Sequence, residues 1–494
     1  MSNGNLYLQP VASSVFSMRP SSVLDSPHPV RPNSLISSPA DSVPDPAAPS
    51  IYRQLLKLGL PVALNHASLA LMQLVDAWLA GRMGSVPLAA ITPAGLLVAA
   101  WAVLGTEILS SVTTLGAQSI GQGRPGAAGL YTWQGIFIGI GFSCICLLTV
   151  PTAFLVFSQL FSSHTPEMIG LETIYYQIAM LGLLPQLVSS ALGNFFAAIQ
   201  RTRILLISTV AGVVVNGWLS YGLAFGKMGM PYLGFAGLAW GTVFASFLQM
   251  TILGAWFLGV ASIRIPYQTG KIVFSKKRIA KSLRSGLPSG IHSFVDFISW
   301  GILVTWLISF FGTAHIAAQT IMVRCITLCY LPAHGLSSAL TTMVGQAVGA
   351  RNYLLARRQA RAALVLNASW MTGLAIIMVC FRDPIIHLFT EDPEIVTACR
   401  TAILWVAAFQ FFDAMNVTYA DALQGAGDTF WPSCVNFTLA LVLLLGGGLA
   451  MVVFFPQYQS SGVWAAATVY VCAHGIIYAL RWKGRAWQDR RFLA

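Results

Sequence analysis

Apolar stretches long enough to cross a membrane recur along the chain from Ile51 onward. A helix of about 20 apolar residues spans a hydrocarbon core of about 30 Å. Twelve such stretches are present, at roughly residues 54–80, 87–116, 130–157, 171–200, 204–226, 233–259, 286–310, 315–345, 362–388, 395–424, 433–455 and 463–482. This pattern predicts an all-α membrane protein with twelve transmembrane helices.

The two halves of the chain share short motifs at a constant offset. Gly84 and Gln118 recur 228 residues later as Gly312 and Gln346. Because each predicted half holds six spans, an even number, both halves enter the membrane in the same direction. The repeat therefore predicts two six-helix lobes related by a parallel pseudo-two-fold repeat, a plan found among secondary transporters.

The predicted spans divide the chain into five segments. They are a Ser- and Pro-rich tail at 1–50, an N-lobe at 51–259, a basic linker at 260–285, a C-lobe at 286–482 and a basic C-terminus at 483–494. The tail lacks an apolar run, so it is predicted to be disordered and is not a secretory signal peptide. A targeting role, or a true start at Met18, stays open as an alternative for this tail.

Composition and charge exclude several classes of protein. Only 9% of the residues are charged and 56% are hydrophobic, whereas soluble proteins carry about 25% charged residues. A soluble enzyme is therefore excluded, and eight cysteines without C-x-x-C spacing do not indicate a disulfide scaffold. The net charge of +12 arises mainly from Lys and Arg on the side shared by both termini. The positive-inside rule then predicts cytoplasmic termini, and no nucleic-acid partner is expected.

Carboxylates inside the spans are the candidate functional groups. Five lie well within them: Asp76, Glu107, Asp296, Asp413 and Asp421. A charge at the bilayer centre costs a few kcal/mol, so each acid should face a cavity or a partner. Among the basic residues, only Arg324 lies as deep. The roles of Glu107, Asp421 and Arg324 stay open at this level.

Two groups of polar neighbours accompany the C-lobe acids. His292 precedes Asp296 by four residues, which places both side chains on one helix face. This pair fits a proton relay as well as it fits a structural contact. Gln410, Asp413 and Asn416 form a polar stripe on the tenth span.

The N-lobe offers a smaller polar set. Gln73 precedes Asp76 by three residues, so the two side chains share a helix face. Asn216 lies alone in the fifth span, where an amide more often joins helices than binds a ligand. No H-E-x-x-H, G-x-S-x-G or G-x-x-x-x-G-K-[ST] motif is present, so neither an enzyme nor an ATP-driven pump is expected.

Five ordered motifs occur along the chain: Gln73 to Gly81, Gly286-Leu287-Pro288 with Asp296 beyond it, Val344 to Ala350, Phe409 to Ala414 and Ala422 to Thr429. Together they resemble the multidrug and toxic compound extrusion (MATE) transporters, in particular their bacterial multidrug branch. The resemblance covers about residues 51–482.

This resemblance implies the export of organic cations or drugs in exchange for Na⁺ or H⁺, without a cofactor. Asp76, Asp296 and Asp413 match acids of helices 1, 7 and 10 that serve ion coupling or substrate binding in that branch. Asp296 and Asp413 would then form the Na⁺ site if the ion is Na⁺. The helix 7 acid is typically Glu, so Asp296 departs from the pattern. Asn216 resembles a fifth-helix Asn of other branches, and Ser220 stands where some of them carry an acid.

The resemblance also implies an integral, multi-pass protein of a bacterial inner membrane, for which we expect a monomer in the lipid bilayer. Two alternatives remain. A lipid-linked oligosaccharide flippase of the same superfamily would need a basic cavity for phosphates, and Arg324 is the residue that favours it. A non-transporting membrane scaffold or receptor would leave the repeat and the buried acids without a purpose.

Overall fold

The computed structural model describes residues 50–160 and 164–488, and these residues form helices joined by short turns. Within them, twelve helical segments are long and apolar enough to cross a membrane, which confirms the prediction of twelve spans. All of them belong to one compact unit, Pro49–Ala494. The predicted tail at 1–50, apart from Ser50, and the last six residues of the predicted segment 483–494 lie outside the described residues.

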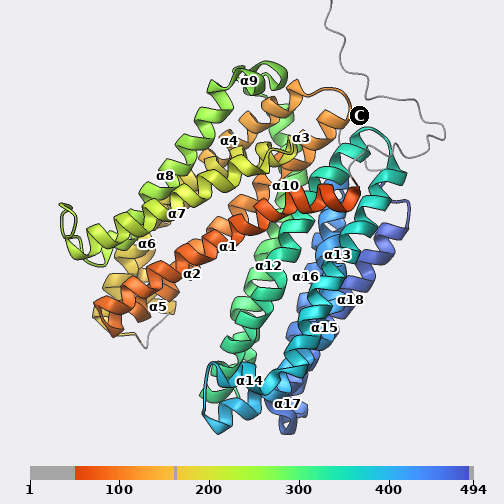
Figure 1. Cartoon of the computed structure of the whole chain (residues 1–494). Coiled ribbons are helices and arrows are strands. Elements are labelled where there is room, and N and C mark those ends of the chain that lie inside the picture. Colours follow the sequence, from red (N-terminus) through yellow and green to blue (C-terminus); the bar gives the residue numbers. More distant parts are fainter. Residues whose placement is uncertain (1–49, 161–163, 489–494) are drawn as a thin grey trace, which may run out of the picture. The chain divides into compact units, whose positions relative to one another are not determined.

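The first six spans form the N-lobe, drawn in red to green in Figure 1. Its helices are α1 (Ile51–Met83), α2 (Ser85–Leu109), α3 (Ser111–Gly121), α4 (Gly126–Leu147), α5 (Ala153–Leu160), α6 (Pro166–Ala198), α7 (Thr202–Phe225) and α8 (Ala236–Gly259). Here α3 continues the span of α2, and α5 continues that of α4. The most buried span is α6, which packs against α2, α4 and α8 around a core of Leu, Phe and Ala side chains.

The last six spans form the C-lobe, drawn in green to blue in Figure 1. After the short linker helix α9 (Ala261–Tyr267), its helices are α10 (Lys276–Ile298), α11 (Val304–Ser309), α12 (Thr313–Gly349), α13 (Tyr353–Cys380), α14 (Arg382–His387), α15 (Pro393–Ala426), α16 (Phe430–Leu439), α17 (Gly447–Phe454) and α18 (Gln459–Lys483). In this lobe α15 packs against both α12 and α18. The C-lobe has an apolar core of its own.

Two helices begin a full two turns or more before their predicted spans. α10 begins at Lys276, ten residues before the predicted start at Gly286 and inside the predicted linker, and α13 begins at Tyr353. In both cases the extra turns are rich in Lys and Arg, which are good helix formers but are not apolar. Hydropathy therefore marks the apolar part of these two helices, and each helix itself starts earlier.

The two lobes are hydrogen-bonded to each other at one end of the bundle. The Gln118 side chain at the end of α3 donates from Nε2 to the carbonyl oxygen of Gly425 over 3.0 Å. Reciprocally, Gln346 of α12 donates to the carbonyl oxygen of Ala198 over 2.9 Å. At this same end the first turns of α1 pack into an apolar cluster with α12, α13, α15 and α18.

Two glycines make this close approach of the lobes feasible. A Cβ atom at Gly121 would clash with the carbonyl oxygen of Gln346, and one at Gly349 would clash with that of Gln118. Both contacts connect α3 with α12, and each is the 228-residue repeat of the other. The internal repeat thus supplies a reciprocal, pseudo-symmetric interlock between the lobes.

Candidate functional site

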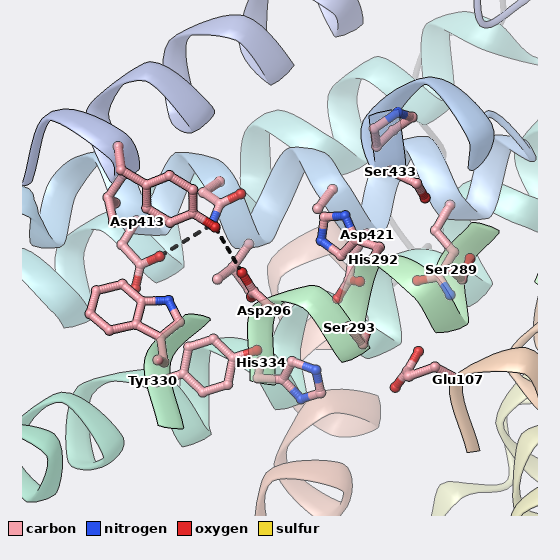
Figure 2. A pocket seen from close by; sticks show the side chains of 18 of the residues that line it. Glu107, Ser289, His292, Ser293, Asp296, Tyr330, His334, Asp413, Asp421 and Ser433 are labelled. Atoms are coloured by element: carbon pink, nitrogen blue, oxygen red, sulfur yellow. Dashed lines mark hydrogen bonds between the residues drawn. The ribbon is translucent and has the colours of Figure 1, made fainter. Parts of the chain in front are cut away.

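A cavity of about 340 Å³ lies among the helices of the C-lobe. Its lining comes from α10, α12, α15, α16 and α18. Among the described residues that line it, Glu107 of α2 alone comes from the N-lobe. Figure 2 shows the cavity's side chains gathered around one space, with Glu107 approaching from the N-lobe. The cavity therefore belongs to the C-lobe, and the N-lobe completes its lining with Glu107.

The lining of this cavity is strongly acidic. Asp296 of α10, Asp413 and Asp421 of α15, and Glu107 all contribute carboxylates. A fifth acid, Asp428, is ion-paired with Arg481, whose Nη2 lies 2.7 Å from its Oδ2. In the described part of the lining there is no Lys or Arg. Two acids whose roles the sequence left open, Glu107 and Asp421, thus lie on the same cavity as the two predicted ones.

A hydroxyl of α18 links the α10 acid to a neighbouring amide. The Tyr470 hydroxyl lies 3.1 Å from Oδ1 of Asp296 and 2.9 Å from Oδ1 of Asn436. One hydroxyl proton can serve only one of these acceptors at a time. The Asn436 amide in turn donates to the carbonyl oxygen of His292 over 2.9 Å. This trio of acid, hydroxyl and amide fixes α10, α16 and α18 at the wall of the cavity.

The second predicted acid has a local partner. Asn416 donates from Nδ2 to Oδ1 of Asp413 over 3.4 Å, one helical turn along α15. Both residues line the cavity, and Figure 2 shows Asp413 and Asp296 among its side chains. The predicted polar stripe is present only in part. Gln410 is fully buried, does not line the cavity, and has no hydrogen-bond partner for its amide among the described residues.

π-Helical turns follow two of the site residues within about one helical turn. One spans Ser299–Leu303, three residues after Asp296, and the other spans Ala440–Gly446, four residues after Asn436. Such insertions are rare in proteins overall, and those that occur are often found at functional sites. Here each one changes the helical register just beyond the residue that faces Tyr470. In the described part of the N-lobe, no helix carries such a segment.

The N-lobe acid has a similar set of partners. Thr242 of α8 donates its hydroxyl to Oδ2 of Asp76 over 3.1 Å. The Asn216 amide of α7 donates to the Thr242 hydroxyl over 3.0 Å and lies 3.3 Å from that of Ser220. Asp76 is only 5% exposed and is not among the residues that line the C-lobe cavity.

The two trios are copies of one arrangement. Asp76 and Asp296 are 220 residues apart, and so are Asn216 and Asn436. The hydroxyl that joins each pair comes from the sixth helix of its lobe. The general repeat has an offset of 228, so the C-lobe acid and amide each lie eight residues before the position at which that repeat would place them. Eight residues correspond to a shift of about 12 Å along a helix axis.

Other predicted residues either lack a hydrogen-bond partner among the described residues or lie away from the cavity. His292 and Asp296 both line the cavity, but Nδ1 of His292 is buried without a hydrogen-bond partner in the described residues. Gln73 is exposed, whereas Asp76 on the same helix is buried. Arg324 is exposed on α12 and is not among the lining residues.

Several site residues were missed by sequence reasoning. Tyr470, Asn436 and His334 all belong to the site or its immediate support, and His334 lies against His66 of α1 with ring centroids 4.8 Å apart. The 220-residue spacing shared with Asp76 and Asn216 was the signal that could have found Asn436. Nothing in the local sequence distinguishes Tyr470, because its partners Asp296 and Asn436 lie on other helices, α10 and α16.

The described residues contain no group of three or more His, Cys, Asp or Glu arranged to hold a metal ion. Two acids of the cavity instead have neutral hydrogen-bond partners, the Tyr470 hydroxyl and the Asn416 amide. The arrangement can attract and hold a small cation or a protonated amine by charge and hydrogen bonding.

Twelve spans in two repeated lobes, with an acid-lined cavity in one of them, define an integral, multi-pass membrane transporter. The sequence matches MatE over residues 61–222 and 288–458, and the chain therefore belongs to this family of multidrug efflux transporters. The resemblance inferred from the motifs is confirmed.

Similar proteins agree with this assignment. "Probable multidrug resistance protein NorM" of Thermotoga maritima is 25% identical over 456 residues, which cover 91% of this chain and 96% of that protein. A protein of the same name from Synechocystis is 27% identical, covering 87% and 94%.

Solved structures share the fold. The eukaryotic MATE transporter AtDTX14 superimposes with a TM-score of 0.79 at 18% identity, covering 89% of this chain and 97% of that one. A MOP superfamily transporter from Pyrococcus furiosus, described as having a binding pocket of reverse polarity, also gives 0.79, at 17% identity, with the same coverage of both chains. Similarity of fold does not identify the ligand, which depends on the residues of the site.

Proposed function

We propose that the protein exports organic cations in exchange for Na⁺ or H⁺ by alternating access. The single observation that carries this proposal is the charge of the C-lobe cavity. Four acids that form no ion pair with any described residue line it, and the described lining has no Lys or Arg. A cavity of this kind favours a cation over an anion or a phosphate.

Asp296 and Asp413 are the proposed sites of ion coupling and substrate binding. Their carboxylates, the Tyr470 hydroxyl and the Asn416 amide oxygen offer the oxygen donors that a hard cation such as Na⁺ prefers. A proton would neutralise the same carboxylates. Either ion would thereby compete with a cationic substrate for the site, which is the basis of exchange.

Exchange also requires that ion and substrate favour different arrangements of the lobes. Glu107 supplies such a dependence, because it reaches the C-lobe cavity from α2 of the N-lobe. When the lobes move apart at the interlocked end, Glu107 would leave the cavity. The negative charge of the cavity would then be smaller. The affinity for a cation would then differ between the two arrangements.

Asp76 contributes to coupling from the N-lobe in this proposal. Its hydrogen bond to Thr242 links α1 to α8, and α1 also packs against the C-lobe. A change of its protonation would act on the contact between the lobes, since Asp76 lies outside the cavity. We therefore expect it to alter coupling more than substrate affinity.

The proposed setting is a bacterial inner membrane, with both termini in the cytoplasm and the protein as a monomer. The basic turns that begin α10 and α13 support this orientation, because Lys and Arg concentrate on the cytoplasmic side. The interlocked end would then face the cytoplasm. The flippase alternative lacks support, since Arg324 does not line the cavity.

Reconstituted protein tests the proposal. Proteoliposomes loaded with a fluorescent organic cation are given a Na⁺ gradient or a pH gradient separately, and release of the dye is followed. One of the two gradients is expected to drive transport. Release that neither gradient accelerates would contradict the exchange mechanism.

A further inference from the structure

A second hollow lies on the C-lobe between the starts of α10 and α16, and it has a volume of about 1270 Å³. It is distinct from the acidic cavity in its chemistry. Three of its lining residues are Lys or Arg, and none of the described lining residues is Asp or Glu. We call this hollow the α10–α16 groove.

One wall of the groove is a single stripe of α10. Lys277, Lys281 and Arg284 follow each other at spacings of four and three, so their side chains share one face of the helix. The same stripe continues with Leu287 and Ile291, which are 46% and 43% exposed. The wall thus changes from cationic to apolar along the helix.

The opposite wall is the matching stripe of α16. Phe430, Cys434 and Phe437 are spaced by four and three, and all three are exposed. No Asp or Glu in the described part of the chain forms a salt bridge with the cations of the α10 wall. The groove therefore presents unpaired positive charge at one end and a large uncovered apolar surface beyond it.

Helix length places this change of polarity at the membrane surface. The span Lys276–Ser309 has 34 residues, which correspond to about 51 Å against a hydrocarbon core of about 30 Å. Its first turns must therefore extend beyond the hydrocarbon. Lys277, Lys281 and Arg284 then lie at the level of lipid headgroups, and Leu287 and Ile291 at the level of acyl chains.

We propose that the α10–α16 groove binds an anionic glycerophospholipid. The three cations would hold its phosphate, and an acyl chain would cover Leu287, Ile291 and the two Phe side chains of α16. Basic pockets between transmembrane helices favour anionic lipid headgroups. A free phosphate would leave the apolar half uncovered, and a lipid without net charge would leave the three cations uncompensated.

The groove adjoins the helices of the transport site without sharing its acids. Ser433 lines both hollows, and its hydroxyl lies 2.5 Å from the carbonyl oxygen of Pro288. The same two helices carry Asp296 and Asn436. A lipid seated between them would therefore support the spacing of the helices that hold the trio.

Lipid binding to the purified full chain tests the proposal. Native mass spectrometry would compare phosphatidylglycerol with phosphatidylcholine of the same acyl chains. The variant Lys277→Gln/Lys281→Gln/Arg284→Gln is expected to bind phosphatidylglycerol about a hundredfold more weakly, or about fivefold per cation removed. The charge-matched control Arg124→Gln/Arg358→Gln/Arg361→Gln removes three exposed cations outside the groove and should retain binding.

Equal losses in the two triple variants, or equal binding of the two lipids, would overturn the proposal. A second measurement places the lipid and needs no variant. Cys434 lines the groove and is exposed, as are Cys144 and Cys380 elsewhere. Phosphatidylglycerol is expected to slow alkylation of Cys434 but not of the other two. Uniform protection of the three cysteines, or protection of Cys434 by inorganic phosphate alone, would reject a lipid in the groove.

Discussion

The two lobes carry the same trio of acid, hydroxyl and amide in different surroundings. In the N-lobe, Asp76 is 5% exposed and does not reach the cavity of the other lobe. In the C-lobe, Asp296 lines a cavity of about 340 Å³ together with three further acids that have no ion pair among the described residues. The same trio thus occurs both with and without an adjoining acidic cavity. The surrounding space and charge determine what the carboxylate can bind.

A second difference concerns the reach of the bridging hydroxyl. The N-lobe uses the short side chain of Thr242, whereas the C-lobe uses the long side chain of Tyr470. π-Helical turns follow the acid and the amide only in the C-lobe copy, among the described residues. The repeat therefore provides a common frame, and local changes in register open one copy toward the cavity.

The largest effect is expected from the C-lobe acids. Asp413→Asn and Asp296→Asn each remove a charge from the cavity at almost constant volume. Efflux should fall about 10- to 100-fold, because a contact with a charged group contributes about 1.5–3 kcal/mol. Initial rates of dye release from proteoliposomes would measure this loss. Wild-type rates in both folded variants would remove the C-lobe cavity from the mechanism.

The interlock between the lobes should be the next most sensitive feature. Gly121→Ala places a Cβ against the carbonyl oxygen of Gln346, and overpacking of this kind costs about 1–3 kcal/mol. Distances between spin labels on α3 and α12 should shift toward a separated arrangement. Gly373→Ala is the control, since a Cβ there meets nothing within 4 Å. An unchanged distance distribution for Gly121→Ala would show that the interlock does not hold the lobes.

A smaller effect should separate the two bridging hydroxyls. Thr242→Val and Tyr470→Phe each delete one hydroxyl, and each is expected to lower stability by about 1 kcal/mol. Only Tyr470→Phe should also change the affinity for the transported cation, because only Tyr470 lines the cavity. Thermal unfolding and dye binding would be measured for both variants. An altered affinity in Thr242→Val alone would contradict the proposal that the C-lobe, and not the N-lobe, binds the cation.

The smallest effect is expected outside both trios. Nε of Arg400 donates to Oδ1 of Asp383 over 2.8 Å and lowers the pKa of this carboxyl. Stabilisation from the pair is present above the ordinary pKa of an Asp and is lost as the pH falls through the lowered value. Both side chains are exposed, so the contribution is small. Asp383→Asn should leave efflux and the melting temperature at pH 7 unchanged, and a clear loss of efflux would show that a carboxylate outside the cavity matters.

Much of the fold could be read from the sequence. Long apolar runs and the 228-residue repeat predicted twelve spans in two lobes, because the bilayer allows little besides helices. The starts of α10 and α13 were placed too late, since Lys and Arg extend a helix without raising hydropathy.

The site was predicted less completely. The cost of a charge in the bilayer selected five acids as candidates, and the family resemblance then singled out Asp76, Asp296 and Asp413. Neither could show that Glu107 and Asp421 share one cavity with two of these acids, because this depends on how α2 and α15 pack against α10. Tyr470 and Asn436 were missed for the same reason, and the π-helical turns that follow Asp296 and Asn436 leave no clear signal in the local sequence.

Equilibrium binding of a fluorescent organic cation to the purified protein tests the central claim most directly. The double variant Asp296→Asn/Asp413→Asn would be compared with Asp76→Asn under identical conditions. We predict that the double variant loses at least about tenfold in affinity, whereas Asp76→Asn stays within about twofold of the wild type. Loss of binding in Asp76→Asn, with normal binding in the double variant, would contradict the assignment of the cation site to the C-lobe cavity.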